Sequence, residues 1–169
     1  MKKKILLVPA AVILLVTGCG KADQQPQENM QAALEHLFET VSEEEYAGFE
    51  EPVSANGNQQ VESQAIPEWA QDRFSSCVSE SCFEKISGNG LLMIPLSAYE
   101  AGKELSLEEL EIQSGNGYYE FQGMVGITGE GKTEKAKIHG SAQTDEEGKV
   151  SDLKLSDPEE ILEKIRENQ

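Results

Sequence analysis

The hydrophobic pattern of the chain first takes helical spacing near residue 30. From there to residue 41, apolar side chains recur three and four positions apart, which places them on one face of an amphipathic helix. These residues are Met30, Ala33, Leu34, Leu37, Phe38 and Val41. His36 falls on the opposite face, so we expect a surface histidine there. The first element of the folded part is therefore predicted to be a helix that packs through one face.

Two shorter helices are predicted before residue 90. Pro67 suits the first turn of a helix. The apolar side chains that would follow on its buried face are Trp69, Ala70 and Phe74, with Cys77 as a candidate addition. Ser81 and Glu84 have the spacing of a capping box, so a third helix is predicted to begin there. Gly88 is a suitable residue to end it.

Two segments, one before and one after these two shorter helices, fit more than one kind of secondary structure. Residues 51–65 are polar and contain Pro52 and Gly57, which predicts a loop, with or without a short helix. Residues 91–96 read LLMIPL, a short apolar run that Pro95 interrupts. This run fits either core packing or an edge strand, because proline within a sheet is confined to edges.

From Leu105 onward the period of the pattern changes from helical to two, which is typical of half-buried strands. Strands are predicted over 105–113, 118–128, 132–143 and 149–155. The alternation slips near Glu108–Glu109, and Asn116-Gly117 between two such runs is a strong hairpin signal. Glycines also interrupt the strands at positions where a bulge or bend is expected, namely Gly123, Gly126 and Gly140. The pattern predicts an antiparallel meander.

The chain is predicted to end in a helix. Asp157 suits an N-cap, Pro158 a first turn, and two glutamates follow. The apolar face of this helix would consist of Ile161, Leu162 and Ile165. The fold class is thus predicted as α+β, with N-terminal helices packed on a curved antiparallel meander sheet and a short C-terminal helix. A single domain over 30–155 with the helix over 156–169 suits the length.

The first eighteen residues have the composition of an export signal. Three lysines precede an apolar run of twelve residues, Ile5 to Val16, which is shorter than the roughly 20 residues of a membrane span. The run ends in Val16-Thr17-Gly18-Cys19, which resembles the lipobox of bacterial lipoproteins. That resemblance implies cleavage after residue 18, a lipid on the Cys19 thiol and anchoring at the extracytoplasmic face of the cell membrane. Residues 19–29 would then form a flexible tether.

The strongly negative net charge of the chain limits which classes of molecule it is expected to bind. The chain has a net charge of −17, and loss of residues 1–18 would remove three lysines and no acid, leaving −20. Binding to nucleic acid depends on lysine and arginine that neutralise phosphates, so we expect no nucleic-acid partner. Cations and basic proteins are favoured electrostatically. The membrane would be reached through the lipid, because anionic head groups repel this chain.

One stretch, GITGEGKT at 126–133, has the letters of a nucleotide-binding P-loop. A working P-loop lies between a strand and a helix. Here the residues after Thr133 alternate with period two, and too few remain for the rest of that fold. We therefore predict a hairpin turn in which Gly129 and Gly131 supply positive φ angles, and no nucleotide binding through Lys132.

Other candidate chemistry is sparse. His139 is predicted to face water beside Lys135, Lys137 and Ser141, and the chain has only two histidines, so no metal site, cofactor or catalytic group is predicted. Cys77 and Cys82 could form a disulfide, remain as two thiols or act as a redox pair, and a disulfide is the preferred reading outside the cytoplasm. The bridge requires a break between the second and third helices, because positions five apart in one helix lie too far apart.

From about residue 30 to 155 the chain resembles the cone-shaped, nuclear transport factor two-like fold of many small bacterial lipoproteins. The likeness rests on CFEKISGNGLLMIPL, LSLEELEIQ, the Asn-Gly turn and YYEFQGMVGIT. The likeness includes no catalytic motif, so it transfers no functional residue. The lipobox, the single small domain and the lack of a catalytic constellation favour a non-enzymatic binding or accessory module for a protein, peptide or small ligand. The alternative is a small enzyme that uses the apolar pocket of the cone. Tyr99, Tyr119 and the aspartates are its candidate groups, and a pocket with convergent polar groups would favour it.

Overall fold

The structure is a computed structural model that describes residues 13–16, 24–50, 68–115 and 117–167. Its helices are α1 (Gln24–Leu37), α2 (Glu43–Glu50), α3 (Glu68–Phe74), α4 (Glu80–Gly88), α5 (Met93–Glu100) and α6 (Pro158–Arg166). Its strands are β1 (Ile13–Val16), β2 (Glu104–Gly115), β3 (Tyr118–Gly129), β4 (Lys132–Thr144) and β5 (Val150–Leu155). The predicted α+β class is confirmed, with helices before the sheet and a short helix after it. The predicted loop at 51–65 lies outside the described residues.

The sheet is built as the period-two pattern predicts. Strands β2 to β5 pair antiparallel in chain order, and β1 adds to the outer edge of β2 in parallel. The register between β2 and β3 shifts between Leu107 and Glu109, so the predicted slip is a β-bulge. Of the described residues in the Asn116-Gly117 turn, Gly117 has a φ of 75°. The bulge keeps apolar side chains on the inner face on both sides of Glu108.

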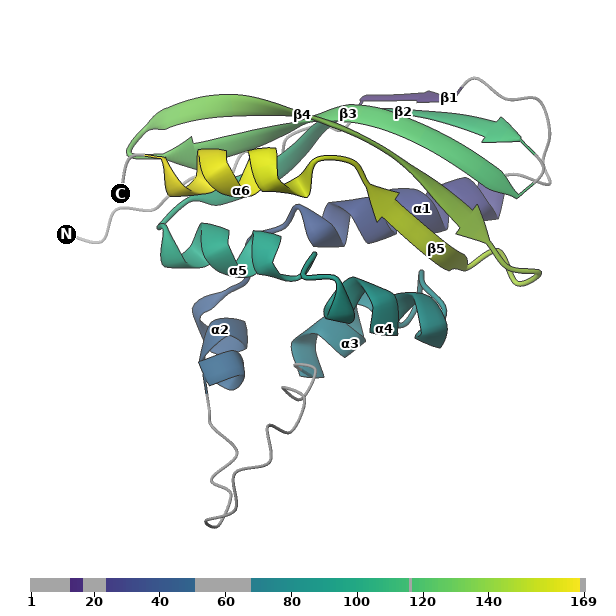
Figure 1. Cartoon of the computed structure of the whole chain (residues 1–169), viewed down its shortest axis with the longest axis horizontal. Helices are drawn as coiled ribbons and strands as arrows, with labels where there is room; N and C mark the ends of the chain where they lie inside the picture. The colour runs from purple at the N-terminus through teal and green to yellow at the C-terminus, as the bar shows by residue number, and fades with distance from the viewer. Residues whose placement is uncertain (1–12, 17–23, 51–67, 116, 168–169) are drawn as a thin grey trace, which may run out of the picture.

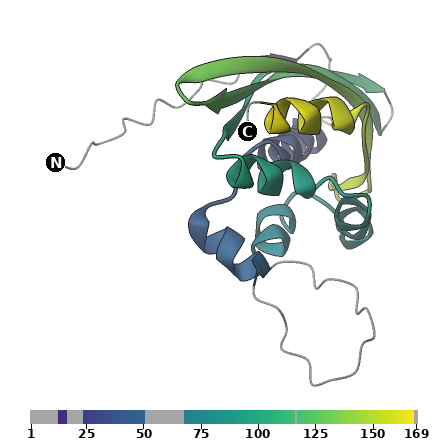
Figure 2. The ribbon, with the colours of Figure 1, turned by 60° about the vertical axis from the view of Figure 1, so that its left-hand side comes forward.

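The helices all lie on one side of the sheet (Figure 1). The sheet curves over α1 and α6, with α5 beside them (Figure 2). Helices α1, α5 and α6 contact strands or each other directly, while α3 packs against α1 and α2 packs against α3. Helix α4 packs against β5, where Val78 forms a bridge with Val150. The other face of the sheet carries no described helix.

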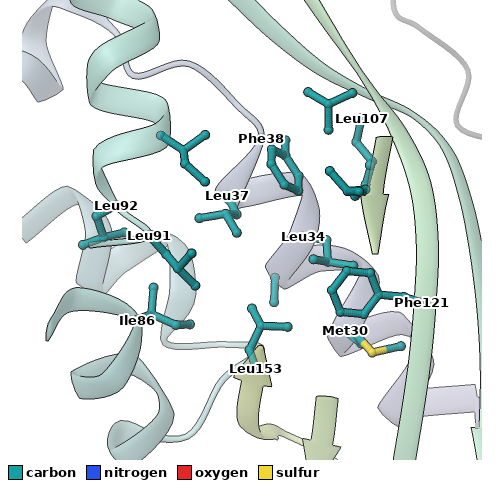
Figure 3. Packing of buried hydrophobic residues seen from close by; sticks show 14 of the residues in the cluster. Met30, Leu34, Leu37, Phe38, Ile86, Leu91, Leu92, Leu107, Phe121 and Leu153 are labelled. Atoms are coloured by element: carbon teal, nitrogen blue, oxygen red, sulfur yellow. The ribbon is translucent and has the colours of Figure 1, made fainter. Parts of the chain in front are cut away.

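The core lies between the helices and the inner face of the sheet. The predicted face is confirmed within α1, where Met30, Ala33, Leu34 and Leu37 are fully buried. Phe38 and Val41 are buried too, at 1% and 3% exposure, but they lie beyond the end of the helix at Leu37. Figure 3 shows Phe121 of β3 pointing toward Met30 and Leu34 of α1. On the far side of α1, Leu37 faces the α4–α5 segment around Leu91. Among the described residues, the buried polar side chains are Gln27 and Ser97.

Two helix starts differ from the prediction, and a third helix lacks its predicted cap. Helix α1 begins at Gln24, so the predicted tether over 19–29 is wrong from that residue onward. Its polar first turns are held to the β4–β5 turn by a hydrogen bond, in which the Asn29 side-chain amide donates to the Gly148 carbonyl at 2.9 Å. Helix α4 is capped by Ser79, whose hydroxyl accepts from the Cys82 amide, and begins ahead of the predicted Ser81. Helix α6 begins at Pro158 as predicted, but the Asp157 side chain makes no capping bond.

The apolar run at 91–96 is helical from Met93 onward, with Leu91 and Leu92 in the turn before it, so the edge-strand alternative is wrong. Pro95 is the third residue of α5, a position whose amide has no partner inside the helix. Proline therefore removes no hydrogen bond there. Helix α5 is apolar on nearly all sides, as is typical of a buried helix, and its residues Ile94, Leu96 and Ala98 are at most 1% exposed.

Candidate functional site

The outer face of the sheet carries a polar row across three adjacent strands. Glu111 of β2 is aligned with Gln122 of β3, and Gln122 is aligned with His139 of β4. The Gln122 side-chain amide donates to a Glu111 carboxylate oxygen at 2.5 Å. His139 is exposed beside Lys137 and Ser141, as predicted. We call these three residues the central row.

Two shallow depressions open on this face, and both include the central row. The first, of about 500 Å³, extends toward β5 and includes Tyr118, Lys154 and Ser156. The second, of about 470 Å³, extends toward the bulge and includes Met124 and Lys137. Their linings combine apolar surface with carboxylate, amide, imidazole and ammonium groups. Such a surface can bind a ligand through several polar contacts without enclosing it.

Charge is distributed unevenly over the outer face. Over β2 and β3 it is acidic, with Glu109, Glu111 and Glu120. Over β4 and β5 it is basic, with Lys137 and Lys154 among the lining residues. Near the bulge the two regions meet in an ion pair of 2.6 Å between Lys135 and Glu108. The hydrogen bond to Glu108 raises the pKa of Lys135.

The groups predicted for an enzymatic alternative are not brought together. Tyr119 is 1% exposed and belongs to the hydrophobic core. Tyr99 stacks on Tyr46 with ring centroids 4.5 Å apart, on the side of α5. Among the described aspartates, Asp152 has a lowered pKa, because its carboxylate accepts a hydrogen bond of 2.8 Å from Lys85. Between the helices and the sheet, where the enzymatic alternative requires the cone's pocket, the described residues form a hydrophobic core cluster.

Cys77 and Cys82 are separate buried thiols, so the preferred disulfide is absent from the structure. The break that the bridge requires is present, since α3 ends at Phe74 and α4 begins at Glu80. The Cys77 thiol instead donates to the Phe74 carbonyl at 3.5 Å. Burial raises the pKa of both thiols to about 11. A thiol with so high a pKa is a weak nucleophile at neutral pH.

A second polar cluster ties the first three helices together. The Arg73 guanidinium on α3 donates to both Glu45 carboxylate oxygens, at 2.9 and 2.7 Å. It also donates to the Glu39 carbonyl at 3.2 Å and lies 5.2 Å from the Trp69 ring centroid. Burial raises the pKa of Glu45, but hydrogen bonds from Ser42 and the charge and hydrogen bonds of Arg73 outweigh it and lower the pKa overall. This bidentate pair has a structural role.

Beside that cluster, His36 differs from its prediction. Its side chain is 30% exposed rather than fully in water, and its ring meets Phe74 edge-on at 5.7 Å. Its Nδ1 lies 3.8 Å from a Glu39 carboxylate oxygen. Between them, these contacts place His36 at the boundary of the core, where it supports the packing of α1 on α3.

The stretch with P-loop letters forms the β3–β4 hairpin. Gly129 pairs with Lys132 at the end of the two strands, and no helix follows Thr133 within the described residues up to β5. The turn residues with positive φ are Glu130, at 51°, and Gly131, at 80°. The prediction is thus right for Gly131 and wrong for Gly129, because Glu130 takes the other position. A P-loop cradle requires a helix N-terminus that this hairpin lacks.

Sequence reasoning did not identify the central row. The period-two pattern places Glu111, Gln122 and His139 on the polar face of their strands. Their alignment depends on the register, and the register depends on the bulge at Glu108 and the length of both turns. The row could have been predicted by counting paired residues outward from each hairpin turn and allowing for the extra residue at the Glu108 bulge.

No protein-family model, curated protein or solved structure matches this chain. Among the described helices, none is both long and apolar enough to cross a membrane. The described residues contain no group of three or more histidine, cysteine, aspartate or glutamate side chains placed to hold a metal ion. The likeness to the cone-shaped fold, and the lipobox with its Cys19, stay predictions, and Cys19 lies outside the described residues.

Proposed function

We propose that this protein is a lipid-anchored lipoprotein of the cell envelope that acts as a non-enzymatic binding or accessory module. The observation that carries the binding role is the contrast between the two faces of the sheet. The inner face is filled by packed side chains, while the outer face has two depressions that meet at the central row. A ligand would therefore be bound on the open face of the sheet.

The anchoring part of the proposal rests on the sequence of the first nineteen residues. The lysines, the apolar run and Val16-Thr17-Gly18-Cys19 have the order of a lipoprotein signal. A thioether-linked diacylglycerol with a second acylation holds a protein at a membrane, whereas a single chain gives marginal binding. The acidic domain would then stand at the outer surface of the membrane on a short linker before α1.

The anchor is tested by fractionation and mass spectrometry after expression in a bacterial host that processes lipoproteins. Wild-type protein should fractionate with membranes and yield an amino-terminal peptide that begins at lipid-modified Cys19. Cys19→Ser should retain residues 1–18 or appear in the soluble fraction. Thr17→Ala keeps a small residue at that position and should behave like the wild type. An unmodified Cys19 in membrane-free wild-type protein would refute the anchor.

The binding face is tested separately by site-specific photo-crosslinking in native membranes. A photoreactive amino acid at Gln122 should give discrete cross-linked products, because this residue lies in both depressions. The matched control places it at Gln71, which is exposed on α3 away from the sheet. Products of equal yield from both positions, or from Gln71 alone, would contradict a binding role for the outer face.

A further inference from the structure

Strand β2 forms the edge of the antiparallel meander, and its beginning is sealed by another part of the chain. The Leu105 amide donates to the Thr40 hydroxyl at 2.8 Å, and that hydroxyl donates to the Lys103 carbonyl at 3.3 Å. The bulge at Glu108 follows directly. Natural sheets protect their edges by such caps and bulges. The part of β2 after the bulge has neither.

That second part of β2 pairs with β1. Ile13 to Val16 run parallel to Glu109–Ile112. In this short ladder the edge of β2 has a neighbouring strand in parallel register. The residues of β1 belong to the leader that the proposed function removes, so the mature protein would expose the unpaired amide and carbonyl groups of this edge. On the inner side, Leu110 and Ile112 stay in the core, at 2% and 1% exposure.

We infer that this edge of mature β2 binds an extended segment of a partner protein that replaces β1 and alternates basic with apolar side chains. The inference rests on the proposed function, because it requires loss of the leader. Side chains of an added strand alternate between the two faces of the sheet. Those on the outer face would lie beside Glu109 and Glu111 and should be basic, while those on the inner face would extend the apolar surface at Leu110 and Ile112.

Charge argues against a second copy of this chain as the occupant. Two β2 edges placed side by side would bring glutamates together on one face, in a chain whose net charge without residues 1–18 is −20. Like charges opposite each other across strands are destabilising. A basic strand gains attraction at the same positions. Main-chain hydrogen bonds would supply affinity, and the alternation of side chains would supply specificity.

The test uses the peptide Lys-Val-Lys-Val-Lys-Val-Lys against the processed protein purified from membranes. The control peptide Lys-Lys-Val-Val-Lys-Lys-Val has the same charge without the alternation. We expect saturable binding of the first peptide, measured by fluorescence anisotropy, and binding at least about tenfold weaker for the second. Hydrogen exchange should slow at residues 109–113 when the first peptide is bound. Cys19→Ser protein whose intact mass shows residues 1–18 retained should bind more weakly than the processed protein.

Charge reversal locates the site. Glu109→Lys combined with Glu111→Lys should weaken binding about tenfold, because each change replaces an attraction by a repulsion. The control pair Glu134→Lys and Glu146→Lys makes the same change in net charge at exposed positions on β4 and the β4–β5 turn, and should have a much smaller effect. Absence of binding, equal binding of both peptides, or equal loss in both double variants would overturn the inference.

The inference and the proposed function fail in different ways. Intact mass that shows residues 1–18 retained in the wild-type protein would refute the anchor, and the edge proposal would fall with it. Processed, lipidated protein that does not bind the alternating peptide would overturn the edge proposal alone. Exchange protection confined to β4 or β5 would do the same, since it would place the peptide on the outer face rather than at the edge.

Discussion

Gly140 lies on β4 close to the β5 backbone and to a core ring, and a methyl group there should destabilise the fold. A Cβ atom at Gly140 would overlap the Lys154 carbonyl oxygen and would lie 2.6 Å from Phe121 Cζ. The first neighbour is backbone, so it moves only if β5 shifts away from β4. The second is a core ring at 3% exposure, which has little freedom to turn. Gly140→Ala therefore strains both the sheet and the core.

The size of the effect follows from two opposing terms. Overpacking a well-packed core costs about 1–3 kcal/mol, and a backbone neighbour places this site in the upper half of that range. Replacing glycine by alanine stabilises by about 0.4–1 kcal/mol through the unfolded chain. We expect a net loss of about 2 kcal/mol, a large share of the roughly 5–15 kcal/mol that holds a domain. For a chain of this size it corresponds to a fall in Tm of about 4–8 °C.

Urea unfolding followed by circular dichroism measures this loss, with Gly88→Ala as the control. Gly88 is the last residue of α4, and a Cβ atom there meets nothing within 4 Å. Its substitution should change the free energy of unfolding by no more than about 0.5 kcal/mol or stabilise slightly. Both variants should keep the m-value of the wild type. If the free energy of unfolding of Gly140→Ala lies within about 0.5 kcal/mol of that of Gly88→Ala, the argument from the close contacts at Gly140 is wrong.

Three further predictions follow from the described contacts. Lys132→Ala should change stability by only a few tenths of a kcal/mol, and calorimetric titration of the wild type with ATP and Mg²⁺ should show no binding; a micromolar Kd lost in the variant would contradict this. Arg73→Ala should destabilise by about 1–3 kcal/mol near pH 7. Because Glu45 has a lowered pKa when folded, the difference should persist above the ordinary glutamate pKa of about 4.3 and shrink as pH falls through the folded value, and a difference constant down to pH 2 would refute the pairing. Cys77 and Cys82 should resist thiol reagents in native protein and react after denaturation without reductant, whereas unreactive denatured protein would indicate the disulfide.

The sequence was sufficient to predict elements in which local pattern and tertiary packing agree. The face of α1 from Met30 to Leu37 and the four strands β2 to β5 follow directly from their periods. The bulge was predictable too, because two adjacent glutamates at 108 and 109 break an otherwise strict alternation. In each case the spacing of apolar residues alone determines which side chains can reach the core.

The failed predictions concern elements whose stability comes from distant contacts. The first turns of α1 are polar, and a residue far along the chain, Gly148, accepts a hydrogen bond from Asn29 there. Pro95 was interpreted as an interruption, but a proline in the first turn of a helix is tolerated. The site was missed for a related reason, since the alignment of Gln122 with its neighbours depends on the register of three strands together.

The bend of the sheet and the candidate site have a common physical origin. Gly123 lines the second depression and Gly140 the first. A Cβ atom at Gly123 would overlap the Glu109 carbonyl oxygen, just as one at Gly140 would overlap that of Lys154. Glycine at both positions lets neighbouring strands approach closely and bend, which closes the inner face around α1 and α6. The depressions on the outer face are lined by these same glycines, so the positions that let the strands approach closely also shape the surface that we propose to bind a ligand.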